Sequence, residues 1–404
     1  MLRLTSPTGI LLLASVTALG PLAVDMYLPA LPTIAEAFNV SSEQAQLTLS
    51  IYMVGFAAAQ LYCGPVSDRF GRKPVLFAGL VIFGLASFAC ACAPNIETLM
   101  AARFFQALGG SAGPVLGRAA VRDVYEPHEG ARVLSYMAGA MALAPAVAPM
   151  IGGAVLVSFG WGAIFFVLVI YAATIAAIVG IAMPEPLSMD HRQSIRFKAI
   201  LRNYHLLISE RRFLAHALTN ASAWAGLFTF LSAAPFVLID FFGVAPEAFG
   251  RYFVVVVAGF LLGTLGGARY GRRIDSERLI VVGAACCAAG GALMAALAIC
   301  GVFTPLAVVV PQGLYMVGVG IIMPQTTAGA LAPFPYFAGT GSSLFGFIQL
   351  TLGTALGTLV VQLADGTSRT MALAIAATGL LSFAGALWVR RDQLRGELTS
   401  AAAS

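Results

Sequence analysis

The chain has 404 residues, of which 59% are hydrophobic and only 10% are charged. About a quarter of the residues in an ordinary soluble domain are charged, so this composition excludes a soluble globular protein. The net charge is +5, and because the basic residues flank the apolar segments, this excess indicates membrane topology rather than a nucleic-acid partner.

Apolar segments follow one another along the whole chain and are separated by short polar breaks. A helix that spans a bilayer needs about 20 apolar residues. Hydropathy predicts twelve such helices, at residues 8–28, 44–64, 75–93, 96–118, 131–157, 161–183, 212–239, 249–269, 279–300, 304–330, 338–363 and 370–389. The sequence therefore predicts an all-α polytopic membrane protein.

A polar stretch at residues 185–211 divides the predicted helices into two sets of six. We expect three parts: an N-terminal six-helix bundle (1–184), a linker (185–211) and a C-terminal six-helix bundle (212–404). The sequence DRFGRK at 68–73 recurs as ARYGRR at 268–273, each time after the second helix of its half. Duplicated halves around a central site are a common plan among transporters.

The basic residues are distributed unevenly between the two sides of the predicted membrane. One set of loops and termini carries 19 Lys and Arg residues, and the opposite loops carry two, Arg251 and Arg369. Cytoplasmic loops are enriched in Lys and Arg, so both termini and the linker are predicted to be cytoplasmic. The six cysteines lie in or beside apolar segments without a CxxC pair, so we expect no metal site and no disulfide framework.

The most charged turn lies between the second and third predicted helices, in GPVSDRFGRKPVL at 64–76. Glycines there permit a tight turn and close packing. By itself the turn could simply anchor the topology, since basic residues alone achieve that. The residues of interest are Gly64, Asp68, Arg69, Gly71, Arg72 and Lys73.

This pattern resembles the signature of the major facilitator superfamily. RFFQALGGSAG (103–113) and APAVAPMIGG (144–153) are similar to its fourth- and fifth-helix motifs, with Ala107 and Ala148 where glycine is usual. Three further stretches resemble the Bcr/CflA group of drug:proton antiporters, which confers bicyclomycin and chloramphenicol resistance. They are LAVDMYLPALP (22–32), RDVY (122–125) and FLSAAPFVLI (230–239).

The resemblance implies two pseudo-symmetric six-helix bundles around a cavity that opens alternately to each side. It implies a monomeric exporter in the bacterial inner membrane that exchanges protons for small drugs, with the proton gradient as its energy source and no cofactor. An exporter of an endogenous metabolite, such as an amino acid or nucleoside, would carry the same motifs. An enzyme is disfavoured, because the sequence has no nucleotide-binding loop and no paired acids at catalytic spacing.

The resemblance also implies gating roles for residues of the first half. Arg72 and Asp123 look like members of the cytoplasmic charge relay of the family. The fifth-helix motif resembles a hinge and seal. Pro145 and Pro149 are expected to bend the helix, and Gly152 and Gly153 to allow close approach of another helix.

Asp25 is the only acid well inside a predicted span, and Arg103 is predicted at a similar depth in the fourth span. An intramembrane charge is by default a functional candidate with a partner. We interpret the two as the proton-coupling pair, as the resemblance also implies. Two alternatives stay open: an ion pair that only locks two helices together, and an Asp25 that reaches the outer interface.

Mid-helix polar and aromatic residues are candidates for the wall of the cavity, although each could equally be a packing residue. They are Tyr27, Tyr52, Gln106, Asn220, Trp224, Phe228, Gln325 and Gln349. Arg118 lies about 22 Å beyond Arg103 along the same predicted helix, where it either reaches the inner interface or lines the cavity.

Overall fold

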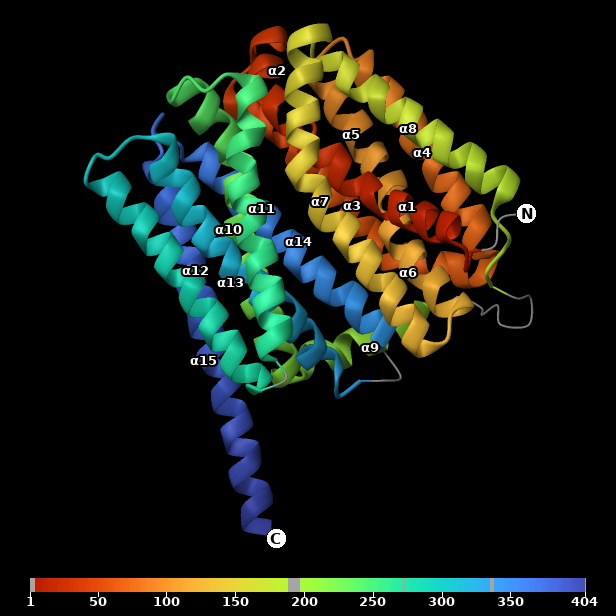
Figure 1. Ribbon diagram of the computed structural model, residues 1–404, viewed down its shortest axis with the longest axis vertical. Coiled ribbons are helices and arrows are strands. Elements are labelled where there is room, and N and C mark those ends of the chain that lie inside the picture. Colours follow the sequence, from red (N-terminus) through yellow and green to blue (C-terminus); the bar gives the residue numbers. More distant parts are fainter. Residues whose placement is uncertain (1–3, 188–196, 272, 335–337, 404) are drawn as a thin grey trace. The chain divides into compact units, whose positions relative to one another are not determined.

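The computed structural model describes residues 4–187, 197–271, 273–334 and 338–403, and within these ranges it contains helices and no β-strand (Figure 1). Ten of the described helical segments are long and apolar enough to cross a membrane. The predicted all-helical, membrane-spanning architecture is confirmed.

One of the twelve predicted segments has a different form. Residues 96–118 are divided at Ser111 between α5 (Ile96–Gly110) and α6 (Ala112–Val124), and each of these helices alone is too short to span a bilayer. Residues 131–157 lie within a single helix, α7 (Pro127–Phe159), as predicted, and its stretch Leu143–Phe159 is apolar.

The chain divides into two compact units. Unit 1 comprises residues 1–196 with 244–251, and unit 2 comprises 197–243 with 252–404. Besides α5, α6 and α7, unit 1 contains α1 (Pro7–Asp25), the 3-10 turn η1 (Leu28–Ala30), α2 (Leu31–Phe38), α3 (Ser42–Phe70), α4 (Arg72–Ala91) and α8 (Trp161–Ala182). Within it α4 packs against α5 and α8, α3 against α5, and α1 against α7.

Side-chain caps fix where several helices of unit 1 begin. Ser6 accepts a hydrogen bond from the Gly9 amide at 3.2 Å, and Asn95 accepts one from the Thr98 amide at 2.8 Å. Ser41 and Gln44 form a reciprocal capping box at the start of α3. Such caps satisfy amide groups that have no partner inside the helix.

The predicted end of the first helix, residue 28 of the segment 8–28, is wrong. The regular α-helix stops at Asp25, and helical structure then continues through η1 and α2 to Phe38. Pro29 and Pro32 lack an amide hydrogen and sit at the first positions of these two short elements, where no such hydrogen is needed. Asp25 is therefore the last residue before a break in the helix.

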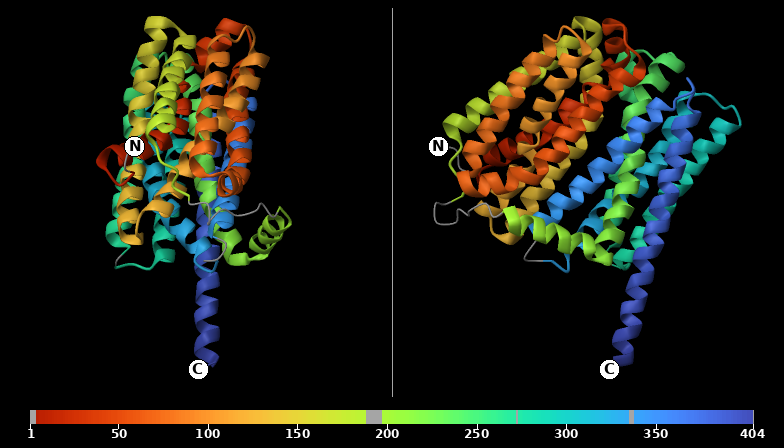
Figure 2. Two further views of the ribbon diagram at one scale, coloured as in Figure 1. Left: turned by 90° about the vertical axis from the view of Figure 1, so that its right-hand side faces the viewer. Right: turned by 180° about the vertical axis from the view of Figure 1, so that it is seen from behind.

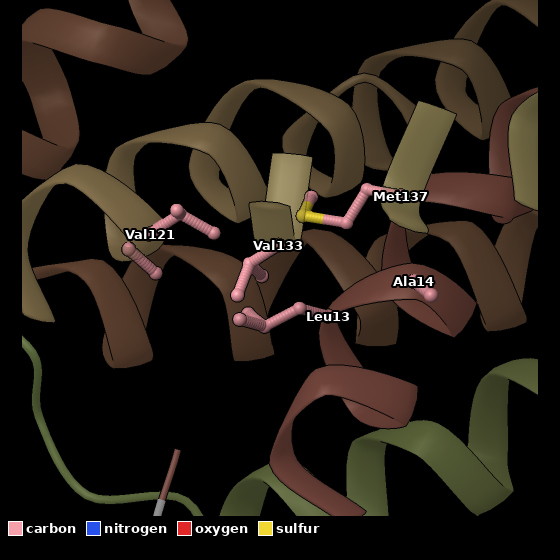
Figure 3. Close-up of a cluster of buried hydrophobic side chains, with 6 residues drawn as sticks. Leu13, Ala14, Val121, Val133 and Met137 are labelled. Atoms are coloured by element: carbon pink, nitrogen blue, oxygen red, sulfur yellow. The ribbon is translucent and has the colours of Figure 1, made fainter. Parts of the chain in front are cut away.

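A compact apolar cluster lies within unit 1 (Figure 3). Side chains from α1, α6 and α7 meet there, and all are at most 8% exposed: Leu13, Ala14, Ala120, Val121, Val133 and Met137. Further along the same helices, Gly113 of α6 lies so close to the Val16 carbonyl of α1 that a Cβ atom would collide with it. These contacts fix α1 beside α6.

Unit 2 contains α9 (Phe197–Ser209), α10 (Arg211–Pro235), the π-helical turn η3 (Phe236–Phe241), α11 (Pro246–Tyr270, of which the turns up to Arg251 belong to unit 1), α12 (Ser276–Ile299), α13 (Pro305–Leu331), α14 (Ala338–Gln362) and α15 (Arg369–Ala403). Helix α12 packs against α13 and α15, and α10 packs against α13, α14 and α15.

Helix α9 occupies part of the predicted linker 185–211, of which residues 188–196 lie outside the described ranges. It lies across the ends of α10 and α14 (Figure 2). Leu207 of α9 is 1% exposed and joins a cluster with Phe213, Leu344 and Phe345. This part of the linker is therefore a packed helix of unit 2.

Candidate functional site

The charged turn between α3 and α4 is built around Arg72. Gly71 has a φ of 101°, a value that side chains rarely tolerate, and it lets α4 begin directly after α3 ends. The Arg72 side chain is 3% exposed, with Nη1 at 2.6 Å from Asp68 Oδ1 and Nε at 2.8 Å from Asp123 Oδ2. The structure thus brings together Arg72 and Asp123, which the resemblance placed in one relay, and adds Asp68 as a second partner of Arg72.

The other residues of the turn contribute less. Arg69 is exposed and lies over the ring of Phe70. The amide of Lys73 donates to Glu185. Gly64 lies inside α3, and a Cβ atom added to it would have no other atom within 4 Å. The prediction that this glycine permits close packing is therefore wrong.

Arg103 and Asp25 are both buried in unit 1, with exposures of 0% and 4%. Arg103 Nη1 donates to the carbonyl oxygen of Ala23 at 3.1 Å and to Gln106 Oε1 at 2.7 Å. Its guanidinium carbon lies 4.4 Å from the ring centre of Tyr27 and 4.3 Å from that of Tyr52. Faces of aromatic rings attract a cation, so these contacts hold the guanidinium without a carboxylate.

No ion pair between Asp25 and Arg103 occurs among the described residues, although both side chains are buried. The prediction that Arg103 pairs directly with Asp25 is therefore wrong. Its guanidinium contacts two tyrosine rings, Gln106 and a backbone carbonyl instead. An ion pair that only locks two helices together is not what this structure contains. Arg103 Nε and Nη2 have no hydrogen-bond partner among the described atoms.

Polar side chains that the sequence analysis missed extend this cluster. Gln106 Nε2 donates to Ser87 Oγ at 2.8 Å, and Ser87 Oγ donates to the Phe83 carbonyl of the same helix at 2.7 Å. The hydroxyls of Tyr27 and Thr48 are 2.5 Å apart. Lone Ser and Thr residues inside apolar segments were the available signal, but hydropathy alone does not show which residues they face.

The glycines of the fifth-helix motif lie at close helix contacts. A Cβ atom on Gly152 would collide with the Met26 carbonyl, and one on Gly153 would come within 2.5 Å of the Pro246 carbonyl, which belongs to the same unit. Helix α7 continues through Pro145, which is half-buried, and Pro149, which is buried. The motif thus brings two backbones close to α7.

Three predicted cavity residues of unit 2, Asn220, Trp224 and Phe228, recur every four residues on one face of α10. Asn220 Nδ2 donates to Thr326 Oγ1 at 2.8 Å, while Asn220 Oδ1 and Trp224 Nε1 are buried without a hydrogen-bond partner among the described atoms. Trp224 and Phe228 lean on α14 where Gly353 leaves room for their rings. The polar groups of Asn220 and Trp224 are uncharged.

The remaining candidates are more dispersed. Gln325 Oε1 accepts a hydrogen bond from Ser276 Oγ at 2.8 Å, which ties α13 to the start of α12, and Gln349 is half-buried on α14. Arg118 is exposed on α6, next to Gly117, which packs on Thr17. Both interpretations of Arg118 stay open.

Comparison with known proteins gives concordant matches over most of the chain. The family model described as Major Facilitator Superfamily matches residues 13–358. A protein of Haemophilus influenzae named "Bicyclomycin resistance protein homolog" is 31% identical over 376 residues, covering 92% of this chain and 94% of the relative. The "Chloramphenicol resistance protein" of Pseudomonas aeruginosa is 31% identical over 362 residues, covering 89% of this chain and 85% of the relative.

A solved structure has the same fold at low sequence similarity. The crystal structure of a D-xylose-proton symporter superimposes with a TM-score of 0.76 at 13% identity, covering 95% of this chain and 97% of that one. At this level of identity the likeness extends to the fold alone.

Proposed function

The chain belongs to the major facilitator superfamily, and from this premise we propose that it is a proton-coupled exporter of small drug-like molecules. It is a transporter and not an enzyme. The relatives are named for resistance to bicyclomycin and chloramphenicol, and a resistance transporter protects its cell by export. The uncharged candidate residues Asn220, Trp224 and Phe228 of α10 support neutral or weakly charged substrates over strongly cationic ones.

The observation that carries the coupling proposal is the burial of Asp25. It is the only buried acid among the described residues, it ends α1, and no described arginine or lysine forms an ion pair with it. A buried carboxyl group without a fixed counter-ion can change its protonation when its surroundings change. Arg103 then acts as a fixed positive charge in the same unit rather than as a partner that Asp25 must release.

The finer topology is part of this proposal. We infer twelve spans, with α5 and α6 together forming the fourth and α7 the fifth, in a monomer of the bacterial inner membrane. Both termini and the linker 185–211 lie in the cytoplasm, the bundles correspond to residues 1–184 and 212–404, and the proton gradient replaces any cofactor. A cysteine placed at exposed Ser209 should resist impermeant thiol reagents in intact cells, and rapid labelling would contradict this orientation.

Asp25→Asn tests the coupling role, because it keeps the size of the side chain and removes the titration. Since Arg103 is held by rings and a carbonyl, the variant should keep its melting temperature and still bind drug. It should lose active export and drug-induced proton movement in vesicles. Glu36→Gln, at an exposed acid of the same unit, is the matched control and should transport normally.

The double variant Asp25→Asn, Arg103→Gln separates loss of titration from an uncompensated positive charge. If Asp25→Asn protein folds correctly and still couples proton movement to export, the assignment is refuted. A susceptibility screen over many antibiotics in an efflux-deficient host identifies the substrates. If expression leaves the antibiotic susceptibility of this host unchanged and the protein exports an amino acid or nucleoside, the metabolite exporter is favoured.

A further inference from the structure

The start of α4 is capped by a residue from a distant part of unit 1. The first amides of a helix have no partner inside the helix, and Gly71, which precedes α4, has no side chain to offer. Glu185, in the extended segment after α8, accepts hydrogen bonds from the Arg72 amide at 2.8 Å (Oε1) and from the Lys73 amide at 3.1 Å (Oε2). A third amide, that of Leu187, donates to Oε1 at 3.1 Å.

This arrangement fixes Arg72 at both ends. Glu185 holds its main chain, while Asp68 and Asp123 hold its guanidinium at 2.6 and 2.8 Å. A carboxylate at a helix N-terminus also meets the positive end of the helix dipole, and its hydrogen bonds are charge-assisted. Three chain segments, at the ends of α3, α6 and α8, therefore converge on one arginine.

We propose that Glu185 is a positioning residue of the charged turn. By capping α4 it fixes the main chain from which Arg72 reaches Asp68 and Asp123, and it makes the segment after α8 part of the gating turn. A cap that only stabilised α4 would leave the contact between Arg72 and Asp123 unchanged when removed. The consequence for transport rests on the proposed function, whereas the consequence for the turn does not.

Hydrogen–deuterium exchange of the purified full-length protein tests the cap and the positioning role separately. In Glu185→Ala, exchange at the start of α4, residues 72–73, should rise about fivefold, which corresponds to the loss of one helix cap. If Glu185 positions Arg72, exchange should also rise in the last turn of α6, beside Asp123. Glu97→Ala is the matched control, because Glu97 is an exposed acid in the first turn of α5, and it should change neither region.

A double-mutant cycle on export gives the second test. Glu185→Ala and Arg72→Gln should each lose most of the export of chloramphenicol, and the double variant should be no worse than Arg72→Gln alone, because both act through the same arginine. Glu185→Gln keeps one carbonyl acceptor and should fall between Glu185→Ala and the wild type.

The outcomes separate this inference from the proposed function. Unchanged exchange at residues 72–73 in Glu185→Ala overturns the cap, and a rise confined to α4 overturns the positioning role. The positioning role is also overturned if the double variant loses export by the product of the two single losses. A wild-type protein that exports none of the drugs tested refutes the proposed function, while the two exchange measurements still decide for or against Glu185.

Discussion

The turn between α3 and α4 in unit 1 and the turn between α11 and α12 in unit 2 make the same connection in different ways. In unit 1, only Gly71 separates the end of α3 at Phe70 from the start of α4, and Arg72 is buried beside two aspartates. In unit 2, α12 begins only at Ser276, five residues after Gly271, and Arg269 and Arg273 are exposed. Arg272, the counterpart of Arg72, lies outside the described residues.

The difference begins with one residue. Position 268 is alanine where its counterpart, Asp68, supplies a carboxylate. The described ion pairs near the second turn are between other residues: Arg278–Asp275 at 3.4 Å and Arg212–Glu277 at 3.9 Å. Glycine and basic residues therefore suffice for a short connection between two helices, whereas a buried charge cluster also requires the acids.

The largest expected contrast is between Arg72→Gln and Arg273→Gln. Removing one partner of a buried ion pair costs about 3–5 kcal/mol, since the other charges remain, while an exposed substitution changes stability by less than about 0.5 kcal/mol. Arg72→Gln should lower the melting temperature and abolish most export, and Arg273→Gln should do neither. Equal effects of the two variants would show that the turns are equivalent.

A smaller contrast within unit 1 concerns two glycines. Gly71→Ala forces a side chain into a conformation with φ near 101°, at a cost of about 1–3 kcal/mol. Gly64→Ala adds a methyl group to open space inside α3 and should stabilise the helix by up to about 1 kcal/mol. The melting temperatures should shift in opposite directions, and export should fall only in Gly71→Ala. A Gly71→Ala protein with normal export would make the turn an anchor only.

The smallest effect is expected at the second turn. Asp275 and Arg278 are each 66% exposed, and exposed ion pairs contribute about 0–1 kcal/mol before screening by salt. Arg278→Ala should therefore leave both the melting temperature and export within error. A marked loss of either would mean that the second turn, too, depends on its charges.

Much of this contrast was predictable from the sequence, because hydropathy and charge report directly on solvent preference. The helical segments and the burial of Asp25 follow from apolar runs and one isolated acid, whereas the grouping of Arg72 with Asp123 was implied only by the resemblance to the family. The break after Asp25 was harder to predict, since Pro29 and Pro32 permit helical structure to continue in shorter elements.

Contacts between distant segments were not predictable. Depth in the membrane placed Arg103 near Asp25, but depth does not say which way a side chain points, and the guanidinium instead lies between Tyr27 and Tyr52. Nothing in the sequence indicated that Glu185 caps a helix, because its partners are amides 112 and 113 residues away. Only the packing of α8 beside α4 brings them together.

The cage of Tyr27, Tyr52 and Gln106 around Arg103 has an evolutionary consequence. Lysine is a poor replacement for this arginine, because a compact ammonium cannot stack as a flat guanidinium does between two rings. Loss of either ring would remove one of the few groups that stabilise this buried cation, so changes at these four positions should be inherited together. Descendants of this protein are expected to keep the whole set or to lose it as one.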